Sequence, residues 1–153
     1  MKVYSILVPI KGLPVDEEAL QMAFAFAAPA PERRAKHRIK LEVIYVVEVP
    51  QSYALDTELP EAIQAGERTL AWAEKLAHDR ELEVTAELLQ ARSAGAAIVD
   101  EAIERGVDLI ILGAQYRRRH GEFNLGVTLP YVLKNAPCRV WVARAPRPAP
   151  EAT

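Results

Sequence analysis

The chain has 153 residues, of which 50% are hydrophobic and 26% are charged, which is typical of a single globular domain with a buried core. A formal net charge of −2 argues against a protein whose whole surface coats nucleic acid or an anionic membrane. One cysteine, Cys138, excludes an internal disulfide and fits a reducing compartment. No apolar run approaches the roughly 20 residues of a membrane span. We therefore expect a cytoplasmic protein without membrane insertion.

The first part of the chain predicts a strand, a helix and a second strand. Val3–Ile10 is rich in β-branched residues and almost continuously apolar, as strands covered on both faces are. A helix should run from about Pro14 to about Ala28, opened by a proline and three acidic residues. Its inward stripe consists of Ala19, Leu20, Ala23, Phe24 and Ala27. The next apolar run, Leu41–Val47, predicts the second strand.

The middle of the chain predicts a longer helix and a less buried strand. The segment from Val49 to Leu59 has no period and should be an irregular surface link. The helix should run from about Pro60 to His78. Its inward residues should be Ile63, Leu70, Ala73 and Ala77. Leu82–Leu89 alternates apolar and polar residues, which favours a position near the edge of the sheet.

The last part predicts two more helix and strand pairs. Ser93 should cap a helix that ends at Gly106. The inward residues of that helix should be Ile98, Ala102 and Ile103. Val107–Gly113 reads as a buried strand, and a short helix should follow Gly126 and end near Asn135. Cys138–Ala143 should form the final strand, with Cys138 as a small core residue.

Alternation of strands and helices favours one doubly wound α/β domain with a parallel sheet. We expect this domain to span residues 1–146, with a flexible tail rich in Pro and Ala at 147–153. In open sheets of this kind, ligands bind beyond the carboxyl ends of the strands, where the strand order reverses. Two loops qualify: residues 9–14 after the first strand and residues 113–128 after the fourth.

The second of these loops has the layout of a phosphate site. Gly113 ends a strand and Gly126 opens a helix, so the backbone N–H groups of Val127 and Thr128 could meet an anion. Thr128 could also cap this helix. The first helix is the poorer anion site, because the acidic run Asp16–Glu18 repels phosphate. A glycine-containing connection without any ligand fits the spacing of the second loop equally well.

Three stretches together resemble the universal stress protein family. They read "ILVPIKG…EEAL", "VIYVVEV" and "GVDLIILGAQY…LGVTLPYVLKNAPCRVWV" and cover nearly the whole chain. The resemblance implies a flavodoxin-like sheet of the adenine nucleotide alpha hydrolase type, with five parallel strands in the order 3-2-1-4-5. It also implies a homodimer formed through the last strand. Some family members bind ATP or related adenine nucleotides, and others do not.

The chain departs from the pattern of the nucleotide-binding members at three positions. Those members carry G-x-x-G, nine residues, and then Gly followed by Ser or Thr. Here Gly113 begins the pattern, Tyr116 replaces its second glycine, and nine residues lead to Gly126, which Val127 follows. Binding members also have an acid in a P-x-D sequence after the first strand, where this chain has Lys11. A lysine donates hydrogen bonds and accepts none, so it suits a phosphate rather than a nucleoside.

The resemblance, together with these departures, predicts the lining of a ligand site. The residues, most of them transferred by position, are Pro9, Ile10, Lys11, Val46, Gly113, Ala114, Tyr116, Gly126, Val127 and Thr128. Lys11 would meet phosphate, and the Gly126 turn would supply N–H donors. The substitutions argue against the ordinary ATP pose, so the ligand is either another anionic small molecule or an adenine nucleotide bound differently. We expect no metal and no catalytic residues.

Three functions stay open on the sequence. The first is a dimeric, non-catalytic regulatory module that binds a nucleotide or another anionic small molecule. The second is a ligand-free adaptor for a protein partner, in which Tyr116 and Val127 fill the vacated pocket. The third is an ATP-binding member with slow hydrolysis. The run Arg117–Arg119 with His120 either clamps phosphates or is solvated. It lacks the interleaved aromatic residues of a nucleic-acid surface, and we expect no nucleic-acid partner.

Overall fold

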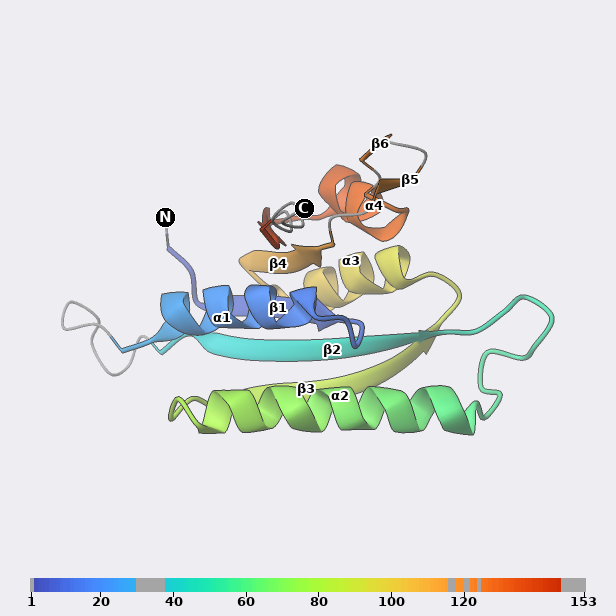
Figure 1. Cartoon of the computed structure of the whole chain (residues 1–153), viewed down its shortest axis with the longest axis horizontal. Helices are drawn as coiled ribbons and strands as arrows, with labels where there is room; N and C mark the ends of the chain where they lie inside the picture. Colours follow the sequence, from blue (N-terminus) through green and yellow to red (C-terminus); the bar gives the residue numbers. More distant parts are fainter. Residues whose placement is uncertain (1, 30–37, 116–117, 120–121, 124, 147–153) are drawn as a thin grey trace, which may run out of the picture.

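The computed structural model describes residues 2–29, 38–115, 118–119, 122–123 and 125–146. Strands and helices alternate along this part of the chain as predicted (Figure 1). In chain order the elements are β1 (Ser5–Ile10), α1 (Val15–Ala27), β2 (Lys40–Glu48), α2 (Pro60–His78), β3 (Val84–Ala91), α3 (Ala94–Arg105), β4 (Leu109–Ala114), β5 (Arg118–Arg119), β6 (Glu122–Phe123), α4 (Thr128–Asn135) and β7 (Arg139–Arg144). None of the helices in this described part is both long and apolar enough to cross a lipid bilayer.

The main sheet has five parallel strands in the order β3-β2-β1-β4-β7. This order confirms the predicted 3-2-1-4-5 arrangement, with β7 as the fifth strand of the sheet. The chain moves from β1 to β2 on one side and later returns to β4 on the other side, so the strand order reverses between β1 and β4. The third strand was expected near an edge, and β3 is indeed an edge strand.

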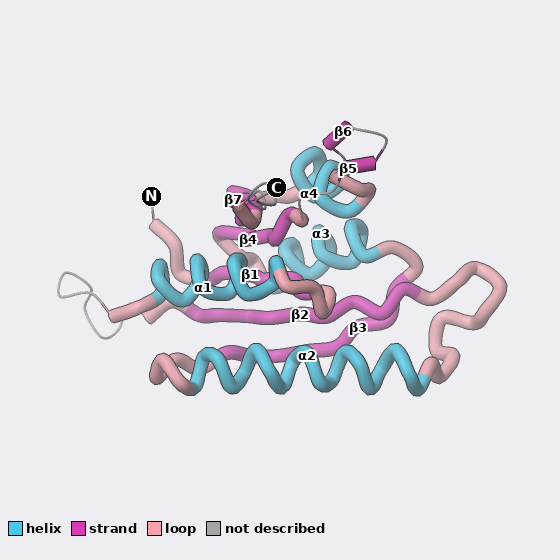
Figure 2. Tube along the Cα trace, in the orientation of Figure 1, coloured by secondary structure: helices cyan, strands magenta, loops and turns pink. Residues whose placement is uncertain are grey.

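Helices cover both faces of the sheet, which explains why the strands are apolar on both sides (Figure 2). Alternate residues of β1 belong to different core clusters. Ile6 and Val8 pack with α1 and α2, while Leu7 packs with α3 and α4. The same alternation holds in β4, where Ile111 belongs to the first cluster and Ile110 to the second.

The predicted inward residues of the helices are buried except for Ile63 and Ile103. All five predicted residues of α1 are buried, and so are Leu70, Ala73 and Ala77 of α2, while Ile63 is half-buried. In α3, Ile98 and Ala102 are buried, but Ile103 is 59% exposed and its prediction was wrong. The inward stripe of α3 continues from Ala102 to Arg105, at helical spacing, and leaves Ile103 to one side.

The ends of α3 were predicted correctly, whereas the start of α4 was not. Ser93 caps α3 by accepting a hydrogen bond from the Ala96 N–H, and Gly106 ends it in the left-handed conformation. Thr128 was expected as a cap of the next helix. The cap position of α4 is instead Val127, and Thr128 is already the first helical residue.

The segment between β4 and α4 contains a small hairpin that the sequence did not predict. Residues of β5 pair antiparallel with residues of β6, with Arg118 opposite Phe123 and Arg119 opposite Glu122. In the view of Figure 1 the two short strands are drawn on the same side of the molecule as α4 and on the opposite side from α2. Strands of two residues carry no hydrophobic period, so the sequence gives no signal for them. Arg117 and His120 lie outside the described residues.

Candidate functional site

A cleft of about 120 Å³ lies beyond the carboxyl ends of β1 and β4. It therefore occupies the point where the strand order reverses, as predicted for the ligand site of an open α/β sheet. The β1–α1 turn forms one wall and the start of α4 forms the other. The described residues that line it are Pro9, Lys11, Leu13, Val15, Asp16, Leu112, Gly113, Ala114, Gln115, Leu125, Gly126, Val127, Thr128 and Leu129.

The structure gathers seven of the ten predicted site residues at this cleft, namely Pro9, Lys11, Gly113, Ala114, Gly126, Val127 and Thr128. Ile10 is not among the lining residues, because side chains alternate along β1 and Ile10 is buried with α1 and α2. Val46, in β2, packs against the core on the side of α3 and α4 and does not line the cleft either. Tyr116 lies outside the described residues.

Two glycines at the cleft are required by backbone geometry. Gly113 lies where α1 crosses the end of β4, and a Cβ atom there would stand 2.9 Å from the carbonyl oxygen of Val15. Gly126 has a φ of +73°, a left-handed conformation that turns the chain into α4. The fold therefore needs glycine at both positions whether or not a ligand binds. The presence of these two glycines is not by itself evidence of a phosphate site.

The β1–α1 turn is organised by Asp16, whose role the sequence did not reveal. Its Oδ2 atom accepts hydrogen bonds from the N–H groups of Lys11 at 3.0 Å, Gly12 at 2.7 Å and Leu13 at 3.0 Å. The carboxylate thus folds back from the start of α1 into the loop before it. Asp16 had been read only as an acid that favours the helix dipole. The signal available was an aspartate four residues after Gly12, because aspartate side chains readily accept hydrogen bonds from the backbone of a neighbouring turn.

The charges at the cleft are of opposite sign and differ in exposure. Asp16 is 3% exposed, while Lys11 is an exposed residue. Burial raises the pKa of Asp16, while the three N–H hydrogen bonds and the positive charge of Lys11 act in the opposite direction. The cleft therefore has a buried, hydrogen-bonded acidic group in its wall and an exposed cationic residue beside it.

The start of α4 offers backbone donors on the other side of the cleft. Val127, at the cap position, has no side-chain cap hydrogen bond, and the N-terminal end of a helix carries a partial positive charge. Val127, which takes the Ser/Thr place of the family pattern, is 85% exposed. It therefore does not fill the pocket with a packed side chain, as the ligand-free alternative had required.

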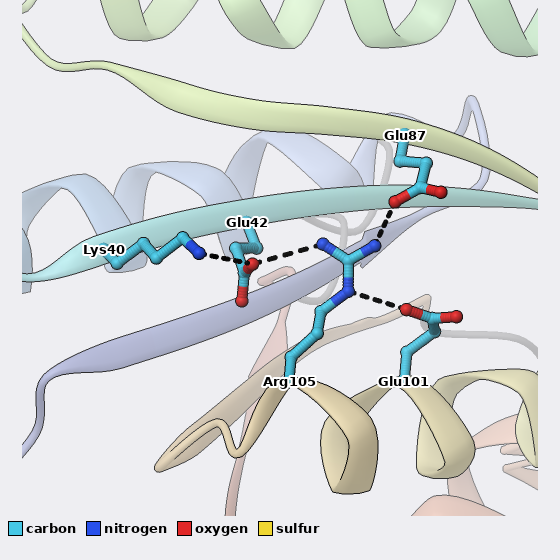
Figure 3. A network of polar contacts seen from close by, with 5 residues as sticks. All are labelled: Lys40, Glu42, Glu87, Glu101 and Arg105. Atoms are coloured by element: carbon cyan, nitrogen blue, oxygen red, sulfur yellow. Dashed lines mark hydrogen bonds and ion pairs between the residues drawn. The ribbon is translucent and has the colours of Figure 1, made fainter.

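Outside the cleft, a second polar cluster joins α3 to the sheet (Figure 3). The guanidinium of Arg105 contacts the carboxylates of Glu101, Glu87 and Glu42, and Lys40 contacts Glu42 from the other side at 3.2 Å. Glu42 is only 2% exposed. The cluster lies at the amino-terminal end of β2, at the opposite end of the sheet from the cleft. Its ion pairs connect α3 to β2 and β3, which is a structural role.

Cys138 lies just before β7 and packs, half-buried, against the core on the side of α3 and α4. This agrees with its predicted place as a small core residue. Burial, followed by the negative charge of Asp108, raises the pKa of its thiol. A thiol of raised pKa holds less of the nucleophilic thiolate.

Comparison with models of protein families matches residues 4–144 to the universal stress protein family. The chain belongs to the universal stress protein family. This confirms the resemblance seen in the sequence. No curated protein matches the chain. The tail predicted at 147–153 lies outside the described residues.

Solved universal stress proteins share this fold. The UspA protein from Lactobacillus plantarum is 25% identical, with a TM-score of 0.73, and the match covers 94% of this chain and 99% of that one. The protein from Archaeoglobus fulgidus in complex with dAMP is 22% identical, with a TM-score of 0.65 and coverages of 93% and 98%. An Arabidopsis thaliana family protein with AMP bound is 14% identical, with a TM-score of 0.59 and coverages of 92% and 90%.

Proposed function

We propose that this universal stress protein is a cytoplasmic, dimeric and non-catalytic regulatory module that binds a small anionic ligand between β1 and β4. An adenine nucleotide is the first candidate. The observation that carries the proposal is the convergence of Lys11 and the start of α4 on one cleft. The ligand state of the cleft would report a metabolic or stress signal to a protein partner.

The chemistry of the two walls suits a phosphate group. An ammonium group supplies positive charge and hydrogen-bond donors, and a helix start without a side-chain cap supplies backbone N–H donors. Two of the solved family proteins were crystallised with adenine mononucleotides, dAMP and AMP. These proteins support the choice of the adenine nucleotide as the first ligand to test.

The non-catalytic part of the proposal rests on the state of Asp16. It is the one carboxylate among the described lining residues of the cleft. Its oxygens already accept hydrogen bonds from the turn, and a general base must instead be within reach of the proton that it removes. This arrangement supports binding without turnover.

Calorimetric titration with AMP, ADP, ATP and cyclic dinucleotides tests the proposal. Lys11→Ala should weaken binding of the best ligand by about tenfold or more, because a charge-assisted hydrogen bond is lost. Lys75→Ala removes the same charge from an exposed position of α2 and should leave binding unchanged. Mass spectrometry of the denatured protein identifies any ligand that copurifies.

Two outcomes would contradict the proposal. If none of the nucleotides gives a binding signal and no ligand copurifies, the nucleotide site is ruled out. Release of phosphate from ATP above the rate in buffer, abolished by Lys11→Ala, would replace the non-catalytic module with the third possibility, an ATP-binding member with slow hydrolysis.

A ligand-free adaptor is the second candidate, in a changed form in which Val127 belongs to a docking surface and does not fill the pocket. Val127 is 85% exposed and Leu125 is 41% exposed at the rim of the cleft, so apolar surface is available there for a protein partner. In that case Val127→Asp should abolish capture of the partner, while nucleotides remain without effect.

A further inference from the structure

The β1–α1 turn contains a group of converging N–H donors that the proposed ligand does not use. The donors of Lys11, Gly12 and Leu13 all lie within 3.0 Å of the Asp16 Oδ2 atom. Successive N–H groups that point at one place form a nest, and a nest binds an anion. Here the anion is the chain's own carboxylate, and it is 3% exposed.

We propose that Asp16 sets the charge selectivity of the cleft, so that the site accepts a nucleotide with one phosphate group and rejects polyphosphates. This inference rests on the proposed nucleotide binding at the same site. Asp16 acts here as a specificity-determining residue. It is not a group that reacts with the ligand.

The first reason is the loss of donors. A di- or triphosphate needs more donors than one ammonium group and one helix start supply. The β1–α1 turn, on the opposite wall of the cleft, carries three further N–H groups, and Asp16 occupies them. A second phosphate group would therefore reach this wall and find an acceptor instead of donors.

The second reason is the balance of charge. The described residues that line the cleft include one formal positive charge, on Lys11, and one formal negative charge, on Asp16. The sum over these described residues is zero, so each phosphate group beyond the first adds negative charge that no further cation among them matches. Repulsion between like charges near a partly buried wall is stronger than in bulk water.

The substitution that separates charge from structure is Asp16→Asn. An asparagine keeps an oxygen that can accept hydrogen bonds from the turn, and it removes the negative charge. Glu17→Gln is the matched control, because it removes the same charge from the same helix turn at an exposed position outside the cleft lining. Asp16→Ser, which keeps a smaller oxygen acceptor, serves if the asparagine variant does not fold.

The experiment measures the dissociation constants of AMP and ATP, without magnesium, for the native chain and both variants. The native chain should bind AMP at least about tenfold more tightly than ATP, and Asp16→Asn should reduce that ratio about fivefold, because ATP gains more from loss of the negative charge. Glu17→Gln should leave the ratio within about twofold, since exposed charges are screened. Urea unfolding of each variant shows that the compared proteins are folded.

The outcomes separate this inference from the function on which it rests. Equal affinity of the native chain for AMP and ATP, or a ratio that Asp16→Asn leaves unchanged, overturns the role of Asp16 while nucleotide binding stands. A merely structural role of Asp16 would lower stability and leave the ratio as it was. If no variant binds either nucleotide, both the site and its selectivity are wrong.

Discussion

At the residue scale, the close approach of α1 to the sheet depends on the absence of one side chain. Gly113 lies near the end of β4 and packs against Val15, the first residue of α1. A Cβ atom at this position would come within 2.9 Å of the Val15 carbonyl oxygen and 3.0 Å of the Val15 Cγ1 atom. The nearer atom belongs to the backbone, which cannot rotate away.

We therefore predict that Gly113→Ala destabilises the fold by about 1–3 kcal/mol, the usual effect of overpacking. Gly66→Ala is the comparison. Its Cβ would stand 2.7 Å from the Leu88 Cδ1 atom and 2.7 Å from the Tyr45 Cδ1 ring atom, so the groups that it meets are side chains and not backbone. The alanine would also favour helix α2 by about 0.8–1 kcal/mol. Urea unfolding measures the free energy of unfolding of both variants. An equal loss of stability in the two variants would contradict the steric explanation.

At the element scale, α3 is held to the sheet by a charge cluster that crosses three elements. Burial opposes the charge of Arg105, but its hydrogen bonds to Glu101, Glu87 and Glu42 raise its pKa above the usual arginine value. Glu42 is the buried member, with a side chain that is 3% exposed. Removing the guanidinium would leave this carboxylate with Lys40 alone, whose side chain is 64% exposed.

Arg105→Met should therefore lower the free energy of unfolding by about 3 kcal/mol, because an uncompensated charge stays buried. Adding Glu42→Gln to that variant should recover about half of the loss, since the buried group is then neutral. Glu87→Gln alone should lower the free energy of unfolding by less than about 1 kcal/mol, because the Glu87 side chain is 50% exposed. A double variant no more stable than Arg105→Met would show that charge burial is not the cause.

At the scale of the whole molecule, the sheet ends in two different edges. Beside β3, the link between β2 and α2 is tied to the strand by Gln90, which donates to the carbonyl oxygens of Leu55 and Thr57. On the opposite edge, β7 carries Val142, which is 37% exposed, while Trp141 packs inward against Phe26 with the ring centroids 5.2 Å apart. An apolar edge strand that is left open invites pairing with another chain.

We predict a homodimer in which two copies pair through β7. Light scattering at micromolar concentration should give twice the 17.0 kDa mass of the chain. Val142→Lys should shift the mass to that of one chain, because a charge would be buried at the interface. Leu55→Lys places the same charge on an exposed residue of the other edge and should leave the dimer intact. A native protein that scatters as a monomer would contradict this arrangement.

The strand runs and the helix stripes could be predicted from the sequence because they depend on residues close together in the chain. The continuous apolar run of Val3–Ile10 indicated a strand covered on both faces, and α1 and α2 do cover one face while α3 and α4 cover the other. The family resemblance added the strand order, while the place of the cleft followed from the rule that ligands bind at the carboxyl ends of strands where the strand order reverses. Ile103 was misassigned because two helix faces are compatible with its spacing, and only packing chooses between them.

Pairings between distant residues were decided by the tertiary structure. Glu42 lies inside a strand that reads as an apolar run, and nothing in the sequence identified its partner Arg105, 63 positions away. Asp16 was visible as a helix acid, yet its bonds to the turn depend on how the loop folds back. Local periodicity is a property of the chain itself, so the sequence determined the elements. Contacts in space exist only after the elements have packed, so the tertiary structure decided which charges face the cleft.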